Sequence, residues 1–242
     1  MTMTTAPTVR FAPLDIIRAA ATVIRARGYY QPLSRQWEKA VPTVMDVEHL
    51  VYGRGPVLDG DGALMARAAS ELPAEMPAAV LEWARTGTAE QGRYRANLAR
   101  AARAAEATAR DLPLLCLAPD VWQREQTRQA RKVQAATDAV LSRHQGEKGE
   151  RLVRTVEVAV IVDQQPRTYG YTVQERRLVK LRDTEGNIYI WEARVKDVTA
   201  LPQQGARIEI RGNVKKHDTY RNAAHGDTAQ TYLTNCRWKP TS

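Results

Sequence analysis

Five short segments, each rich in β-branched residues or alternating between apolar and polar ones, constrain the fold of this 242-residue chain more than any other feature. Alternation with a period of two places one face of a strand on a core and the other in solvent. The segments span residues 152–162, 171–182, 187–193, 206–216 and 229–238. They predict a β domain over residues 150–239.

The order of these strands favours one topology. The sequence DTEGN at residues 183–187 is typical of a hairpin turn, because Gly186 and Asn187 tolerate positive φ. A longer link separates the third strand from the fourth. This pattern fits a small five-stranded barrel of the OB type, whose ligand face centres on strands two and three and on the loops after strands one and four. On that map the two loops are residues 163–170 and 217–229.

The residues before this domain have a helical composition. Alanine is concentrated in residues 62–139, and Asp15 and Gly28 suit the start and stop of a helix over residues 15–27. Residues 93–110 also predict a helix, and Asp120 is a candidate N-cap for a last one that ends near residue 143. We therefore predict an α+β chain, with an all-α helical domain at residues 12–143 followed by the barrel.

Charge points to a polyanionic partner. The formal net charge is +9, of which residues 143–242 supply +6 through 18 Lys and Arg against 12 Asp and Glu. A basic surface attracts nucleic acid or an anionic membrane. The alternative is that the charge only keeps an Arg-rich protein soluble.

Cysteine use and hydropathy indicate the compartment. Cys116 and Cys236 lie far apart in sequence, which suggests no disulfide framework. No apolar run approaches the roughly 20 residues that cross a bilayer, and residues 1–10 lack the apolar core of a secretory signal. We expect a cytoplasmic protein that does not bind membranes.

Both predicted loops contain tyrosine and arginine, the residue types that bind single strands. Aromatic rings stack on bases, while Lys and Arg side chains bind phosphates. The candidate nucleic-acid-binding residues are Arg167, Tyr169, Tyr171, Arg177, Lys180, Tyr189, Trp191, Lys215, Lys216, His217, Tyr220 and Arg221. Packing explains Tyr189 and Trp191 as well as base stacking does, and basic strand residues also guard exposed sheet edges.

No motif in the chain indicates a chemical reaction. The glycine-rich residues 53–62 lack the Gly-Lys-Ser/Thr ending of a phosphate-binding loop and the ligand spacing of a calcium loop. The sequence spacing of four potential zinc ligands does not match that of a closed zinc site; these ligands are His144, His217, His225 and Cys236. Cys116, in an apolar stretch, is expected to be buried and inert. We predict no catalytic residue, no metal and no cofactor.

Three segments, DTEGNIYIWEA, GARIEIRGNVKKHDTY and TAQTYLTNCRW, resemble the C-terminal module of uncharacterised proteins of phages, prophages and mobile elements. A Ser-x-His-x-Gly-x-x-Gly pattern at residues 142–149 adds to the resemblance. This chain departs from the family's pattern at Asn213, where threonine is usual, at Asn235, where arginine is usual, and in a longer loop between Tyr220 and Gln230. The matching positions are Asp183, Gly186, Asn187, Trp191, Gly212, Val214, Lys215, His217, Tyr220, Gln230, Thr231, Leu233 and Thr234.

This resemblance implies an OB-like fold and an association with DNA metabolism. Together with the charge, it predicts a protein that binds single-stranded DNA with little sequence preference. The helical domain would then serve self-association or a protein partner. The alternative is an adaptor of a mobile element that binds a host or replication protein.

Overall fold

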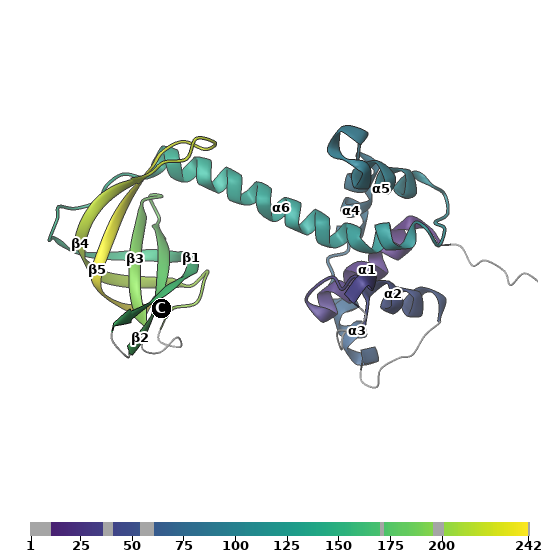
Figure 1. The fold of residues 1–242 in the computed structure, drawn as a ribbon, viewed down its shortest axis with the longest axis horizontal. Coiled ribbons are helices and arrows are strands. Elements are labelled where there is room, and N and C mark those ends of the chain that lie inside the picture. The colour runs from purple at the N-terminus through teal and green to yellow at the C-terminus, as the bar shows by residue number, and fades with distance from the viewer. Residues whose placement is uncertain (1–10, 36–40, 54–60, 170–171, 196–200, 242) are drawn as a thin grey trace, which may run out of the picture. The chain divides into compact units, whose positions relative to one another are not determined.

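The structure is a computed structural model that describes residues 11–35, 41–53, 61–169, 172–195 and 201–241. The chain forms two compact units, Met1–Arg128 and Gln129–Ser242. Helices make up the first unit, and a closed five-stranded barrel makes up most of the second (Figure 1). The predicted α+β class, with a helical part before an OB-like barrel, is confirmed. The units divide inside the last helix, which the sequence analysis placed wholly in the helical domain.

The helical unit packs around the apolar face of its first helix. Gly28 ends that helix with a φ of 82°, as the sequence predicted. Ile16, Ile17 and Val23 lie in a core with Leu98 and Leu115 from later helices. The helices are α1 (Pro13–Arg27), α2 (Thr43–Tyr52), α3 (Asp61–Ser70), α4 (Met76–Arg85), α5 (Arg93–Arg103) and α6 (Leu112–Leu141), with 3-10 turns at Leu33–Arg35 and Ala89–Gln91.

Three predicted helix boundaries are wrong. The α1 helix begins at Pro13 with Ala12 at its N-cap position, so Asp15 lies in the first turn and does not cap the helix. The α5 helix ends at Arg103 because the chain then extends to pair Ala107 with Phe11 through a 2.9 Å backbone hydrogen bond. The α6 helix begins at Leu112, before the predicted cap Asp120, and contains Pro119. That proline removes one helical hydrogen bond. The burial of Leu115 and its apolar neighbours in the helical core offsets this cost.

The barrel has the strand order β1-β2-β3-β5-β4 and closes between β4 and β1. Neighbouring strands are antiparallel except β3 and β5, which pair in parallel from Ile188–Gln230 to Trp191–Leu233. The strands are β1 (Arg151–Tyr169), β2 (Thr172–Asp183), β3 (Ile188–Val195), β4 (Arg207–Tyr220) and β5 (Thr228–Pro240).

Side-chain alternation fills the barrel from all five strands. Ile208, Ile210 and Val214 of β4 point inward, as their spacing predicted. In β3 the inward residues are Tyr189 and Ala193. The interior also contains Leu152, Val156, Val158, Val179, Leu181 and Leu233.

Two predicted loops are largely strand. The β1–β2 hairpin continues to the pair Tyr169–Thr172, so residues 163–169 are not a loop. The β4–β5 hairpin continues to Tyr220–Thr228, which leaves 221–227 as its loop. Both extensions run past the barrel core. Asp163 and Thr168 are exposed in the first, and Thr219 and Tyr220 are exposed in the second. Hydrophobic alternation, the signal for a strand, is therefore missing there.

Candidate nucleic-acid interface

The part of the predicted site at residues 163–171 is only partly described by the structure. Tyr171 lies outside the described residues, as do the side chains of Arg167 and Tyr169. Arg177, near the same hairpin, forms an ion pair with Asp163 in which Nε and Oδ1 are 2.7 Å apart.

The two aromatic residues of β3 serve packing. Tyr189 is fully buried, and its hydroxyl donates a 2.9 Å hydrogen bond to Oδ2 of Asp183. Burial raises the pKa of Tyr189, and the Asp183 carboxylate raises it further. Trp191 is half-buried and packs on the barrel core. The prediction that Tyr189 stacks on bases is therefore wrong, because its ring is not accessible.

The DTEGN turn is built around the Asp183 carboxylate. Oδ1 accepts hydrogen bonds from the backbone of Glu185 and Asn187, and Oδ2 accepts one from Nδ2 of Asn187. Gly186 has a φ of 89°, and a Cβ there would lie 2.9 Å from Leu141 of α6. The predicted turn is confirmed, and its glycine also allows α6 to approach the barrel.

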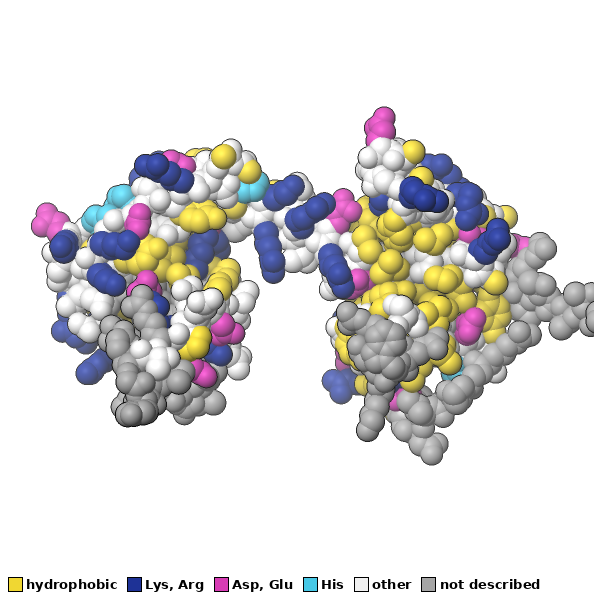
Figure 2. All heavy atoms as spheres, in the orientation of Figure 1, with side chains coloured by type: hydrophobic (Ala, Val, Ile, Leu, Met, Phe, Trp, Pro, Cys, Tyr) yellow, Lys and Arg dark blue, Asp and Glu magenta, His cyan; other side chains and the backbone are white. Residues whose placement is uncertain are grey.

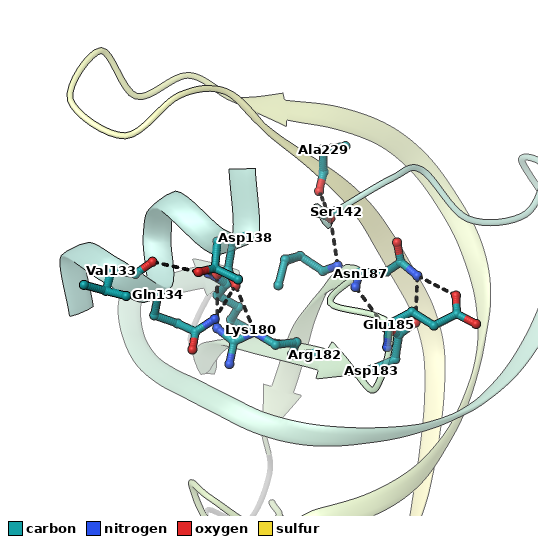
Figure 3. Close-up of polar contacts among 12 residues, drawn as sticks. Val133, Gln134, Asp138, Ser142, Lys180, Arg182, Asp183, Glu185, Asn187 and Ala229 are labelled. Atoms are coloured by element: carbon teal, nitrogen blue, oxygen red, sulfur yellow. Dashed lines mark hydrogen bonds and ion pairs between the residues drawn. The ribbon is translucent and has the colours of Figure 1, made fainter. Parts of the chain in front are cut away.

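Asp138 of α6 binds two cations of β2. Lys180 Nζ lies 2.6 Å from Oδ2, and Arg182 Nε lies 2.9 Å from Oδ1 (Figure 3). The Asp138 side chain is only 2% exposed. Burial raises its pKa, but hydrogen bonds from Arg182, Lys180 and Gln134 lower it more, so the net pKa lies below the ordinary value. Lys180, which was predicted to bind phosphate, therefore forms an ion pair with a buried carboxylate instead.

The segment after α6 ties the helix to β3 and β5. The Ser142 hydroxyl donates to the carbonyl of Ala229 over 2.6 Å and accepts from the Ile188 amide over 3.0 Å. The Arg143 amide donates to Oδ1 of Asn187. These contacts give Ser142 and Asn187, two positions of the resemblance, a structural role.

His217 of β4 contacts the same segment after α6. Its ring stacks on that of His144 with centroids 4.7 Å apart and planes 7° apart. Nε2 of His144 donates to the Asp218 carbonyl over 2.9 Å, and Nε2 of His217 donates to the Gln145 carbonyl over 3.3 Å. Both rings thus connect this segment with β4, and His217 is engaged within the barrel unit.

The end of α6 therefore covers part of the face that OB-type barrels use for ligands. Lys180 pairs with Ile190 across β2 and β3, on the side opposite the core residues Val179 and Tyr189. Asp138 reaches that outer side. The β4–β5 loop touches the same helix, since a Cβ on Gly226 would lie 3.3 Å from Ala139. Ligand access to β2 and β3 is reduced at this end.

The remaining predicted residues lie on or just beyond β4. The side chains of Lys215 and Lys216 are 53% and 49% exposed, with carboxylates of Glu192 and Asp218 at 3.5 Å and 2.5 Å. Tyr220 is 56% exposed. Arg221 is exposed and has no ion-pair partner within the described part of the chain.

Sequence reasoning missed Tyr232 of β5. It lies directly opposite Lys216, whose ammonium group is 4.5 Å from the centre of the tyrosine ring. Its signal was its position between Thr231 and Leu233, which both point inward, so that Tyr232 lies on the outward phase of β5. We call Lys215, Lys216, Tyr220, Arg221 and Tyr232 the β4 cation face. Figure 2 shows many Lys and Arg side chains on the visible side of the barrel unit.

The structure offers no metal-binding cluster among the residues it describes: no three His, Cys, Asp or Glu side chains converge there. His144 and His217 meet each other but form no such group with His225 and Cys236. Burial raises the pKa of Cys236 to about 12 and also raises that of Cys116. Both thiols are poor nucleophiles as a result.

Comparisons of the chain with protein families, curated proteins and solved structures find no match. The resemblance to phage and mobile-element proteins therefore stays a prediction. In the described ranges, no helix combines the length and apolar character needed to cross a bilayer.

Proposed function

We propose that the barrel binds single-stranded nucleic acid, with DNA as the preferred form and little sequence preference. The observation that carries the proposal is the β4 cation face, where Lys216 lies over the half-buried ring of Tyr232. Lys215, Tyr220 and Arg221 are exposed on or just beyond the same strand. Cations bind the phosphates of a strand, and stacking on an aromatic ring contributes about 1–3 kcal/mol per base.

The ion pairs on this face do not prevent phosphate binding. Lys215 and Lys216 are both about half exposed, as are their partners Glu192 and Asp218 at 39% and 44%. Exposed pairs of this kind contribute about 0–1 kcal/mol. A nucleic-acid strand whose phosphates bind both lysines therefore replaces these ion pairs at a small cost in free energy.

The covered end of the β2–β3 face supports the same assignment. Lys180 and Arg182 would have to release the buried Asp138 carboxylate before they bound a phosphate. Lys215 and Lys216 have no buried partner to release. The helical unit is proposed to bind a protein partner or a second copy of the chain.

Full-length protein is expected to bind a labelled oligothymidylate of about 15 nucleotides, within the range of OB-type sites, more tightly than duplex DNA of equal length. Duplex bases are stacked on one another and leave the tyrosines without a ligand. Fluorescence anisotropy at two salt concentrations measures both affinities, with RNA of the same length as a third probe.

Binding should weaken at the higher salt concentration, because each neutralised phosphate releases counterions. A chain that binds none of the three probes at low salt would contradict the proposal. In that case, nuclease-resistant capture of one stoichiometric protein would favour the adaptor alternative.

A further inference from the structure

Three exposed arginines lie on neighbouring strands of the barrel, outside the β4 cation face. Arg211 of β4 is directly opposite Arg237 of β5 and Val153 of β1. Arg151 lies two residues from Val153 and opposite Asn213. We call Arg151, Arg211 and Arg237 the arginine cluster.

The cluster has no acidic partner within the part of the chain that the structure describes. Most other cations of the barrel have one, including Lys216 with Asp218 and Lys239 with Glu209. Like charges directly opposite on adjacent strands destabilise a sheet. Guarding a sheet edge does not explain them either, because β4 pairs on both sides. Folding alone therefore gives no reason for this arrangement.

A β-bulge places Arg237 in the cluster. Between the pairs Asn213–Thr234 and Arg211–Arg237, β5 has two residues where β4 has only Gly212. Asn235, one of those two, has a φ of 52°. Without the extra residue, Cys236 would oppose Arg211 and Arg237 would turn toward the barrel interior. Bulges commonly redirect a side chain in this way next to functional sites.

The cluster continues the face of the proposed strand-binding site. Ile210 and Val214 point inward, so Arg211 and Lys215, each the next residue along β4, lie on the same outer side of the strand. Four residues of strand separate these two cations by about 13 Å. Guanidinium groups bind phosphate oxygens through paired hydrogen bonds.

We infer that the arginine cluster is a second phosphate-binding site, which binds the backbone of the same nucleic-acid strand beyond the part held at Lys215–Arg221. The inference rests on the proposed function and adds the direction in which the nucleic acid runs. The nucleic-acid strand follows β4 from the C-terminal end of β4 toward Arg211. The site has a length requirement, because a short strand held at the first site does not reach the cluster.

The test compares full-length wild-type protein with the double variant Arg211→Gln/Arg237→Gln on two oligothymidylates. One has about 3 nucleotides, whose phosphates span less than the distance from Lys215 to Arg211, and the other has about 15, within the range that OB-type barrels contact. The variant is expected to bind the long strand about 10-fold more weakly, with a salt slope smaller by about 1.4. Its affinity for the short strand should stay within about twofold of wild type.

Arg207→Gln is the matched control. Arg207 is exposed on the same strand but lies opposite Glu157, and its replacement is expected to leave both affinities unchanged. Circular dichroism confirms that the variants fold. The inference is wrong if the double variant binds the long strand as wild type does, or loses affinity equally for both lengths. Failure of the wild-type protein to bind either strand instead contradicts the proposed function itself.

Discussion

Replacement of Asp138 with alanine is expected to lower the free energy of unfolding of the barrel unit by about 3 kcal/mol, the lower end of the range for breaking a buried ion pair. The carboxylate is 2% exposed and holds two cations, Lys180 and Arg182, that are themselves largely covered. Without it, both positive charges remain beside the end of α6 with no counter-charge. Hydrogen exchange of peptides that cover β2 and β3 measures the loss in the full chain.

Asp163→Ala is the control for this variant. Asp163 also pairs with a β2 cation, Arg177, but its side chain is 80% exposed. Its removal should change the exchange of β2 amides little, because exposed pairs contribute about 0–1 kcal/mol. Equal effects of the two replacements would contradict the assignment of Asp138 as the residue that holds α6 on the barrel.

The same carboxylate predicts an acid limit to the stability of the barrel. The pKa of Asp138 in the folded chain lies below its ordinary value. A lowered pKa contributes stability at pH values above the unfolded pKa of about 3.9, and this stability is lost as the pH falls through the folded pKa. The free energy of unfolding of Asp138→Asn should therefore fall less than that of wild type as the pH drops through this range.

Replacing Lys215, Lys216 and Arg221 together with alanine is expected to weaken binding of single-stranded DNA by at least about 70-fold near 0.1 M salt. Charge-assisted hydrogen bonds contribute about 1.5–3 kcal/mol each, and the two exposed ion pairs that they replace offset about 2 kcal/mol at most. The salt slope should fall by about 2, from about 0.7 for each lost phosphate contact. Anisotropy titrations at several salt concentrations measure both quantities.

A triple variant with the same change in net charge separates local contacts from overall charge. Arg93, Arg110 and Arg128 are exposed residues of the helical unit. Their replacement with alanine should reduce affinity much less, through the long-range field alone. If this variant loses as much affinity as the β4 variant, the β4 cation face is not the binding site.

The architecture was predictable because core burial leaves a pattern in sequence. Ile208, Ile210 and Val214 alternate over the part of β4 that covers the core, and Gly186 marks the turn after β2. The strand ends at residues 163–169 and 217–220 extend beyond the core and carry polar residues on both sides. Their pairing depends on backbone hydrogen bonds, which no side-chain pattern reports.

The candidate site was less predictable, because exposure depends on contacts between distant residues. Lys180 and Lys216 are both basic residues on predicted strands, and only Asp138, 42 residues before Lys180, distinguishes them. Alternation placed Tyr189 and Trp191 on one face but did not show which face is inside. The bulge at Asn235 shifts the phase of β5, so the outward position of Arg237 was not visible in the sequence.

The measurement that tests the central claim most directly is a titration of isotope-labelled protein with an oligothymidylate of about 15 nucleotides, followed by the amide chemical shifts of the barrel. We predict that the largest changes occur in β4 and its loop between Arg211 and Arg221 and around Tyr232 of β5. Amides from Lys180 to Ile190 and near Asp138 should keep their shifts. Changes centred on that second region would contradict the account, because they would show that the strand displaces α6 and binds β2 and β3.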